Sequence, residues 1–362
     1  MTSVHPQNDN RIFYKEVMTL FDRGYDISLI VAGVENQLIN KVKIIGYKKS
    51  AGRLKRIFKT SLLDMIKVCR KVDADIYHFH DPELIFTGLY LKILGKTVVY
   101  DIHENNAASI LSKPYIKSRF KKIFLSKVFD IFEKNSVRFF DAIVTARPDI
   151  SKKFTHKNLI TLRNFPILPN FETLEKVNIR KGKPSIIFVG NMTKIRGIYE
   201  LLEAIKTLEQ YELWLLGPIQ EKDLEDKIKA GCRNVRYFGV VEAYDVFRYI
   251  QQADIGIITF LSVPNHINTL ATKPFEYMAC GKPMIMSSFP YWKETFQEGS
   301  FYVDPSNVKE IREKIISLFS DRKGMTAMGK LNQKLSKEHY NWTSESQKLI
   351  KLYEKLLYMP KI

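Results

Sequence analysis

Short runs of β-branched and aromatic residues alternate with amphipathic stretches along the whole chain. In the first half, these runs predict strands at residues 25–31, 42–47, 75–80, 96–100 and 141–145. Between them, apolar residues at helical spacing predict helices at about residues 11–23, 54–71, 82–94 and 115–139. Such alternation of strands and helices is typical of a doubly wound parallel sheet.

The second half repeats this alternation after a polar stretch punctuated by prolines, residues 166–184, which predicts a linker. Strands are predicted at residues 185–190, 212–216, 235–238, 254–260 and 283–287, and late helices at 308–319 and 343–357. A chain of 362 residues exceeds the size at which a single core usually stops growing. We therefore expect an α/β protein with domains at residues 1–166 and 167–340, followed by a helical segment at 341–362.

Charge adds an asymmetry to this picture, because most of the net charge of +18 lies in the first half. Residues 1–180 contain 31 Lys and Arg against 18 Asp and Glu, a surplus of 13, whereas the remainder has a surplus of 5. An anionic partner of the first half is expected. Nucleic acid, an anionic lipid surface and a phosphorylated substrate all fit this surplus.

Composition excludes some protein classes. No apolar run approaches the roughly 18 to 20 residues that a membrane-spanning helix needs, and the polar start of the chain is no signal peptide. The isolated cysteines Cys69, Cys232 and Cys280 argue against a disulfide framework or a zinc site. We expect a cytoplasmic protein.

The most informative motif is Lys-Pro-Phe-Glu-Tyr-Met-Ala-Cys-Gly-Lys-Pro at residues 273–283, where a short helix opens directly out of a loop between two predicted strands. In open parallel sheets, ligands bind beyond the carboxyl ends of the strands, where helix N-termini offer free N–H groups to phosphate oxygens. Pro274 suits the first turn, and Gly281 suits the C-cap. Glu276 can accept hydrogen bonds from sugar hydroxyls while Lys273 meets phosphate. Alternatively, Glu276 only complements the helix dipole.

A second loop, at residues 190–197, follows the strand at 185–190 and carries the cations Lys194 and Arg196 between Gly190 and Gly197. Arginine can hold a phosphate through two parallel hydrogen bonds. The alternative is a solvated basic loop.

In the first half, two His/acid groups follow successive strands: His78-Phe79-His80-Asp81 and Asp101-Ile102-His103-Glu104. These strand ends should converge on one crevice. His80, Asp81, His103 and Glu104 are possible metal ligands, although neither group has the spacing of a common metal motif. For His78 and His80, the alternative is a buried structural role.

The predicted helix at residues 115–139 follows these groups and mixes cations with apolar residues over 113–128. One reading is an apolar face that packs on the sheet. The other is an interfacial helix at an anionic bilayer.

The 273–283 motif resembles the donor-site signature of retaining glycosyltransferases of family 4, and the resemblance extends over nearly the whole chain. It implies the GT-B fold, in which two Rossmann-like domains face each other across a cleft and a final helix crosses back to the first domain. It places Arg196 at the usual lysine position of the diphosphate-binding loop, Asn268 where a glutamate is frequent, and His103 at the histidine of the catalytic pocket. Family members also open with a complete first strand, for which only residues 1–4 are present here.

The resemblance implies catalytic roles for His103 and Glu276. Substrate-binding roles are expected for a larger set: Gly190, Lys194, Arg196, Gly197, Asn268, Thr269, Lys273, Asp81 and Glu104. The implied reaction is transfer of a sugar, with retention of configuration and without metal or cofactor, from a nucleotide-diphosphate donor (a UDP-sugar by family habit). The expected acceptor is a hydroxyl of a lipid-linked or growing cell-surface glycan such as capsule or O-antigen, at the inner face of the plasma membrane.

Two other functions stay open from the sequence. A nucleotide-sugar 2-epimerase shares the GT-B architecture. A basic nucleic-acid-binding protein fits the charge but lacks a recognisable reading motif. A dehydrogenase is disfavoured because no G-x-G-x-x-G follows a strand.

Overall fold

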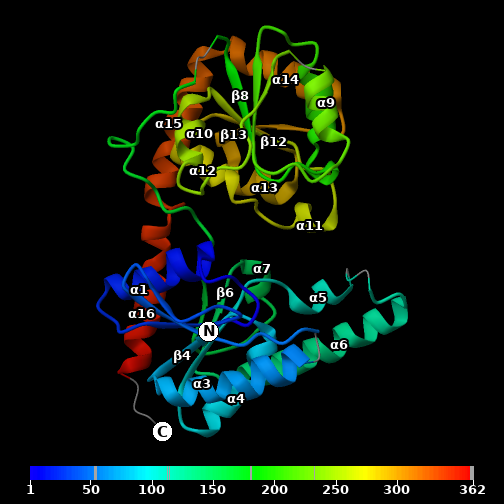
Figure 1. Cartoon of the computed structure of the whole chain (residues 1–362). Coiled ribbons are helices and arrows are strands. Elements are labelled where there is room, and N and C mark those ends of the chain that lie inside the picture. The colour runs from blue at the N-terminus through cyan, green and yellow to red at the C-terminus, as the bar shows by residue number, and fades with distance from the viewer. Residues whose placement is uncertain (53–54, 112, 114, 180–181, 232, 359–362) are drawn as a thin grey trace. The chain divides into compact units, whose positions relative to one another are not determined.

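The computed structural model describes residues 1–362 except 53–54, 112, 114, 180–181, 232 and 359–362. The chain divides into two compact units. Unit 1 contains Met1–Asn164 and Glu345–Ile362, and unit 2 contains Phe165–Ser344 (Figure 1). The final helix α16 (Trp342–Leu357) thus runs from unit 2 into unit 1.

The strands of unit 1 form two groups, each hydrogen-bonded as a separate sheet, and most of their pairs are parallel. The strands are β1 (Ser28–Ala32), β2 (Gln37–Ile39), β3 (Val42–Tyr47), β4 (Ile76–Phe79), β5 (Thr97–Ile102), β6 (Ala142–Thr145) and β7 (Leu159–Thr161). One group has the order β1-β3-β2 and the other β4-β5-β6-β7, with β2 antiparallel to β3. Residues 1–3 lie between the groups, since Thr2 N–H donates to Ile30 O over 2.9 Å and His80 N–H donates to Met1 O over 3.3 Å.

Helices follow these strands as the sequence pattern predicts. The described helical segments of unit 1 are η1 (Asn10–Val17), α1 (Met18–Asp22), η2 (Arg56–Asp64), α3 (Met65–Val72), η3 (Pro82–Leu84), α4 (Ile85–Ile93), α5 (Asn106–Leu111), α6 (Arg119–Ser136), η4 (Val137–Phe139), α7 (Pro148–Ser151) and α16. The first is capped by Asp9, whose carboxylate accepts from the N–H groups of Arg11 and Ile12. This carboxylate therefore satisfies two of the free N–H groups at the start of η1.

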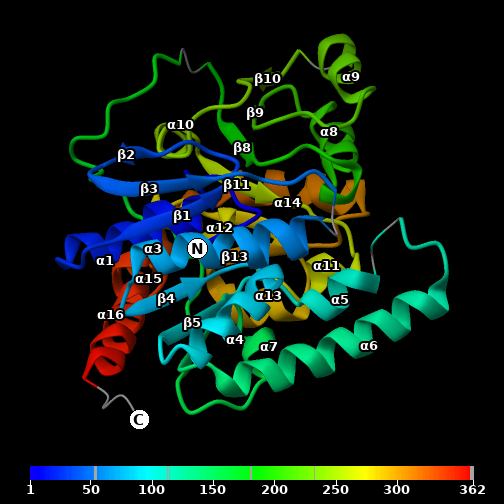
Figure 2. The same cartoon turned by 60° about the horizontal axis from the view of Figure 1, so that its bottom comes forward.

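The predicted helix at residues 115–139 begins later than expected. It starts at Arg119, because the Ser118 side chain caps it by accepting from Lys121 N–H. Of the two readings of this helix, the apolar face that packs on the sheet is wrong for the amino-terminal half, where Phe120 is 85% and Phe124 is 65% exposed. In Figures 1 and 2 this end of α6 extends away from the strands of unit 1.

Unit 2 contains a single parallel sheet. Its strands are β8 (Ser185–Val189), β9 (Glu212–Leu216), β10 (Val235–Tyr237), β11 (Ile255–Ile258), β12 (Met284–Ser287) and β13 (Ser300–Val303). Their order, β10-β9-β8-β11-β12-β13, is the doubly wound order 3-2-1-4-5-6. The prediction of doubly wound α/β units is confirmed.

Helices cover both faces of this sheet. The described helical segments are η5 (Lys194–Arg196), α8 (Ile198–Ile205), α9 (Leu224–Gly231), α10 (Val246–Gln252), α11 (Pro264–Ile267), α12 (Lys273–Ala279), α13 (Pro290–Phe296), η6 (Gln297–Gly299), α14 (Val308–Ser320) and α15 (Arg322–Glu338). The core of unit 2 is formed by the apolar faces of these helices and by strand residues such as Trp214, which is fully buried. None of the described helices is long and apolar enough to cross a membrane.

Candidate active site

In unit 2, the order of the strands reverses between β8 and β11, which are neighbours in the sheet but not in the sequence. Ligands of open α/β sheets bind in the crevice at this switch point, beyond the carboxyl ends of the two strands. The loop that follows β8 is the predicted diphosphate loop at residues 190–197, and the segment that follows β11 leads through α11 into α12. The topology therefore brings both predicted donor motifs to the same edge of the sheet.

Gly197 fixes the first loop against the end of β11. Its backbone has φ of +67°, and a Cβ atom at this position would lie only 1.8 Å from Thr259 O. A larger residue cannot be accommodated without moving the backbone of one segment. In addition, Leu261 N–H donates to Ile195 O over 2.9 Å. The two segments thus form one packed rim.

Arg196 lies in this rim and is half-buried. Its guanidinium stacks over the Phe260 ring at 5.2 Å from the centroid, and Nη1 donates weakly to Asn191 O over 3.4 Å. Burial lowers the pKa of Arg196, and no carboxylate among the described residues pairs with it. A partly desolvated cation without a counter-ion is suited to binding an anion. Lys194, also on this loop, is exposed.

On α12, Lys273 and Glu276 form an ion pair. Lys273 Nζ lies 2.7 Å from Oε1 and 2.8 Å from Oε2 of Glu276. The carboxylate is in the first turn of the helix, where it also complements the dipole. The lysine expected to contact phosphate and the carboxylate expected to contact sugar hydroxyls are therefore both present, and without a ligand their charges pair with each other.

The rest of the 273–283 motif serves the fold. The Tyr277 hydroxyl accepts from Val189 N–H over 3.0 Å and donates to Ile187 O over 3.1 Å, which ties α12 to β8. Gly281 has φ of +64°, and its N–H donates to Met278 O, as expected for a C-cap glycine. Between α11 and α12, Asn268 is exposed, and Thr269 O accepts from Trp292 Nε1 over 2.6 Å.

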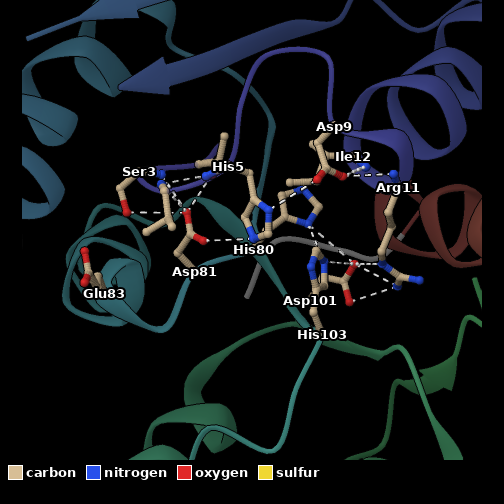
Figure 3. A network of polar contacts seen from close by, with 12 residues as sticks. Ser3, His5, Asp9, Arg11, Ile12, His80, Asp81, Glu83, Asp101 and His103 are labelled. Atoms are coloured by element: carbon tan, nitrogen blue, oxygen red, sulfur yellow. Dashed lines mark hydrogen bonds and ion pairs between the residues drawn. The ribbon is translucent and has the colours of Figure 1, made fainter. Parts of the chain in front are cut away.

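In unit 1, His103 is part of a polar network at the carboxyl ends of β4 and β5 (Figure 3). Its Nε2 lies 3.1 Å from Asp101 Oδ2 and 3.2 Å from His80 Nδ1. Asp101 is fully buried and also accepts from Arg11, through Nε over 3.1 Å and Nη2 over 2.9 Å. Although burial alone would raise the pKa of Asp101, Arg11 and His103 hold it well below its usual range.

Two other predicted substrate-binding residues of unit 1 are placed differently. Asp81 is buried, and its Oδ2 accepts from Thr2 Oγ1 over 2.7 Å and from Ser3 N–H over 2.6 Å. Its acceptor capacity is thus largely occupied by the amino-terminal segment, which it fixes between the strand groups. Glu104 is exposed next to His103.

Four residues of this network could in principle hold a metal ion: Glu16, His78, His80 and Asp101. Their potential ligand atoms lie within 4.8 Å of one another. This set differs from the one considered from the sequence, which contained Asp81, His103 and Glu104. The Arg11 guanidinium already supplies a positive charge here, 3.0 Å from Glu16 Oε1, so we do not assign a metal site.

Sequence reasoning missed Arg11 and Glu16. Both are buried on η1, among the apolar residues Ile12, Phe13 and Val17. Two charged residues within the apolar face of an amphipathic helix are a detectable signal, because a buried charge needs a partner. The pattern does not identify that partner, because Asp101 lies 90 positions away from Arg11 in the sequence.

Comparisons with known proteins agree with this architecture. Residues 183–321 match the family model described as glycosyl transferases group 1. Among curated proteins, spore coat protein SA of Bacillus subtilis is 26% identical over 190 residues, which cover 48% of this chain and 49% of that protein. The putative teichuronic acid biosynthesis glycosyltransferase TuaH of the same organism is 23% identical over 205 residues, covering 53% and 51%. The matches thus span about half the length of these relatives.

Solved structures match over nearly the whole chain. Sucrose-phosphate synthase from Thermosynechococcus elongatus superposes with a TM-score of 0.73 at 15% identity, covering 98% of this chain and 95% of that one. The Anabaena protein Alr3699/HepE, solved in complex with UDP-glucose, has a TM-score of 0.65 at 13% identity, with 99% of both chains covered. The fold is therefore that of GT-B glycosyltransferases, with two Rossmann-like domains.

Proposed function

We propose that this protein is a retaining glycosyltransferase of family 4 that moves a sugar from a UDP-sugar to a hydroxyl of a lipid-linked or growing cell-surface glycan. The observation that carries the proposal is the cationic rim of unit 2. There, Arg196 lies half-buried at the switch point of the sheet without a carboxylate partner among the described residues. A diphosphate is the anion that this position suits.

The comparisons support the donor half of this proposal. The matched family model covers residues 183–321, a stretch that includes both donor motifs. Alr3699/HepE, which shares the fold, binds UDP-glucose. The name of TuaH refers to a cell-surface polymer, which supports a glycan acceptor.

In the proposed reaction, Arg196 and Lys194 bind the diphosphate and stabilise the negative charge that develops as it leaves. Lys273 then exchanges its ion pair with Glu276 for a phosphate contact, which frees the carboxylate for sugar hydroxyls. His103 of unit 1 binds near the reacting carbon. The acceptor hydroxyl attacks the sugar face from which the diphosphate departs, so the anomeric configuration is kept. The proposal needs no metal ion, since the charge on the diphosphate is met by side chains.

We further propose that α6 brings the protein to an anionic membrane surface, where a lipid-linked acceptor resides. The amino-terminal half of this helix exposes large apolar side chains between lysines: Phe120, Ile123, Phe124, Leu125 and Val128 alternate with Lys121, Lys122 and Lys127. Exposed apolar side chains next to cations are characteristic of interfacial helices. The charge surplus of residues 1–180 has the matching sign.

Thermal unfolding with nucleotides tests the donor assignment. UDP and UDP-sugars should raise the melting temperature more than ADP or GDP, because the proposed donor is a UDP-sugar. A ligand at about 100 times its Kd stabilises the fold by about 2.7 kcal/mol. The shift should be lost in Arg196→Ala. It should persist in Arg248→Ala, which removes a half-buried arginine paired with Asp245 elsewhere in unit 2.

A wild-type protein that no nucleotide diphosphate stabilises would overturn the proposal. Incubation of UDP-N-acetylglucosamine without an acceptor gives a second check. Formation of the 2-epimer at a steady rate would assign the same donor site to an epimerase instead.

A further inference from the structure

The residues around His103 form a chain of buried polar contacts that begins on the first helix. Arg11 comes from η1, Asp101 from β5, and His103 from the loop that follows β5. These elements belong to the same unit, so the contacts do not depend on how the two units are arranged. Figure 3 shows Asp101 between the guanidinium and the imidazole.

The N–H groups of Arg11 are directed mainly at Asp101. Nε and Nη2 donate to the carboxylate, and Nη1 donates to Leu162 O over 2.7 Å. Glu16 Oε1 lies 3.0 Å from Nε, yet neither carboxylate oxygen of Glu16 accepts a hydrogen bond from a described residue. Burial raises the pKa of Glu16 well above its usual range, which favours the neutral acid. The charge of Arg11 is thus compensated by Asp101.

An ionised carboxylate can only accept hydrogen bonds, and this determines which tautomer His103 adopts. With Asp101 as acceptor 3.1 Å away, the proton of the imidazole lies on Nε2. The other ring nitrogen, Nδ1, forms no hydrogen bond with a described residue. The side chain remains 16% exposed, so this nitrogen is available to a ligand.

We propose that Asp101 is a positioning residue of the transfer site: fixed by Arg11, it accepts the Nε2 proton of His103 and so leaves Nδ1 as an acceptor for a sugar hydroxyl. This inference rests on the proposed glycosyltransferase function for its role in turnover. The hydrogen bond itself can be tested without any substrate.

The neighbouring titratable groups are consistent with this arrangement. His80 Nδ1 lies 3.5 Å from Asp101 Oδ2, and burial lowers the pKa of His80 well below its usual range, so His80 is neutral. Burial also lowers the pKa of His78 to about 3. Among these groups, the charge of Arg11 is the one that chiefly keeps Asp101 ionised.

Proton NMR of the full-length protein tests the hydrogen bond. A histidine N–H proton donated to a buried carboxylate exchanges slowly and gives a downfield resonance coupled to a ring nitrogen. We expect this resonance in the wild type, with its assignment to His103 established by its loss in His103→Gln. It should be lost in Asp101→Asn and remain in Glu16→Gln, the same change from carboxyl to amide at a neighbouring position of the network that does not contact His103. Its absence from the wild type, or its survival in Asp101→Asn, would overturn the proposal.

Asp101→Asn leaves Arg11 buried without its counter-ion and could prevent folding. Arg11→Lys is the second variant, since it keeps the charge but loses the two-pronged contact. It should shift or broaden the His103 resonance through faster exchange. An unchanged resonance in Arg11→Lys would overturn the role given to Arg11.

Turnover separates this inference from the function on which it rests. With the donor and acceptor that the wild type uses, Asp101→Asn should lower kcat by about a hundredfold. Its affinity for UDP should change less than about twofold, because the donor loops lie in unit 2. Wild-type kcat in the variant would overturn the positioning role alone. Failure of the wild type to bind UDP would overturn the glycosyltransferase proposal, and the NMR result would still decide the hydrogen bond.

Discussion

At the scale of single residues, the donor rim gives the most direct prediction. Arg196→Ala should lower transfer at least tenfold with an unchanged melting temperature in the absence of ligand. The reason is that a charge-assisted hydrogen bond to a phosphate is worth about 1.5 to 3 kcal/mol. Within the protein, Arg196 makes a weak hydrogen bond of 3.4 Å to Asn191 O and lies over the Phe260 ring. Glu276→Gln should have a similar effect on transfer. Initial rates with a UDP-sugar measure both, and wild-type rates in the two variants would contradict the donor assignment.

A second prediction for single residues concerns the pair His5 and Asp9, in which Nδ1 of the histidine lies 3.3 Å from Oδ2 of the aspartate. Burial would raise the pKa of Asp9, but the hydrogen bond with His5 and those from Ile12 and Arg11 lower it to about 2. A carboxylate with a lowered pKa stabilises the fold above its unfolded pKa of 3.8, and this contribution is lost as the pH falls toward 2. Because Asp9 is partly exposed, the contribution is about 1 to 2 kcal/mol.

The stabilising contribution of the His5–Asp9 pair is limited at higher pH by the titration of His5. The hydrogen bond with Asp9 raises the pKa of His5, so its contribution is complete below 6.5 and lost as the pH rises through the raised value. Asn is as good an N-cap as Asp, so Asp9→Asn removes the charge and keeps the cap. In urea, the difference in the free energy of unfolding between wild type and Asp9→Asn should be largest between about pH 4 and 6, disappear as the pH falls toward 2, and become smaller as the pH rises through the raised pKa of His5. A constant difference from pH 2 to 8 would mean that the charge is unimportant.

Residues whose role depends on local geometry could be predicted, and residues whose role depends on distant partners could not. Gly281 was recognisable because the C-cap of a helix favours glycine. The environment of Asp101 was not predictable, since Arg11 reaches it across 90 positions of the sequence. For Asp81 the sequence suggested a ligand contact, whereas Thr2 and Ser3 occupy its carboxylate.

At the scale of elements, periodicity predicted which segments form strands and helices better than it predicted what covers them. β3 and β9 have the predicted bounds, because runs of β-branched and aromatic residues have few alternatives in an α/β chain. For α6 the same periodicity predicted an apolar face but not its exposure, since the pattern does not say whether protein or another surface covers that face. Short elements such as β2 and β7 were missed because three residues carry too little pattern.

The exposed face of α6 predicts binding to anionic vesicles. The full-length protein should sediment with vesicles that contain phosphatidylglycerol, remain in solution with phosphatidylcholine alone, and be released by salt, because each cation near such a surface contributes about 1 kcal/mol. The triple variant Lys121→Glu, Lys122→Glu, Lys127→Glu should lose binding.

A charge-matched control separates a local site from general attraction. The changes Lys323→Glu, Lys330→Glu and Lys334→Glu alter the net charge equally at exposed positions of α15 in unit 2. This variant should still sediment. Equal loss in both triple variants would show that the surplus charge acts without a dedicated surface, and an unaffected α6 variant would remove the membrane role from this helix.

At the scale of the whole molecule, the sequence predicted two α/β units, and the contacts of α16 show how the chain is divided. Along the chain, the boundary between the units falls between Asn164 and Phe165, close to the first proline of the predicted linker. From Glu345 onward, α16 belongs to unit 1: Tyr353 hydroxyl lies 2.9 Å from His78 Nδ1, and Lys355 donates to Asn158 Oδ1 over 2.7 Å. Pattern alone predicted the helix, whereas these two partners lie more than 190 positions earlier in the sequence.

This division predicts that the units differ in their ability to fold alone. Residues 165–344 contain a complete sheet, its core and both donor motifs, so a protein of this range should unfold cooperatively and bind UDP about as tightly as the full chain. Residues 1–164 lack α16, whose buried side chains include Leu349, Leu352 and Tyr353. Each is worth about 1.5 to 3 kcal/mol when buried, and their sum approaches the 5 to 15 kcal/mol of total stability of a typical domain.

The first fragment should therefore be unfolded or molten, and a peptide of residues 342–357 added in trans should restore its structure. Urea unfolding followed by circular dichroism measures this, with titration calorimetry of UDP as the readout for the second fragment. The peptide with Leu349→Ala and Tyr353→Ala is the matched control, since it keeps the helix but removes its buried contacts. A cooperative transition of residues 1–164 without the peptide would show that α16 is dispensable for unit 1. An unfolded fragment 165–344 would mean that the donor unit depends on contacts outside its own range.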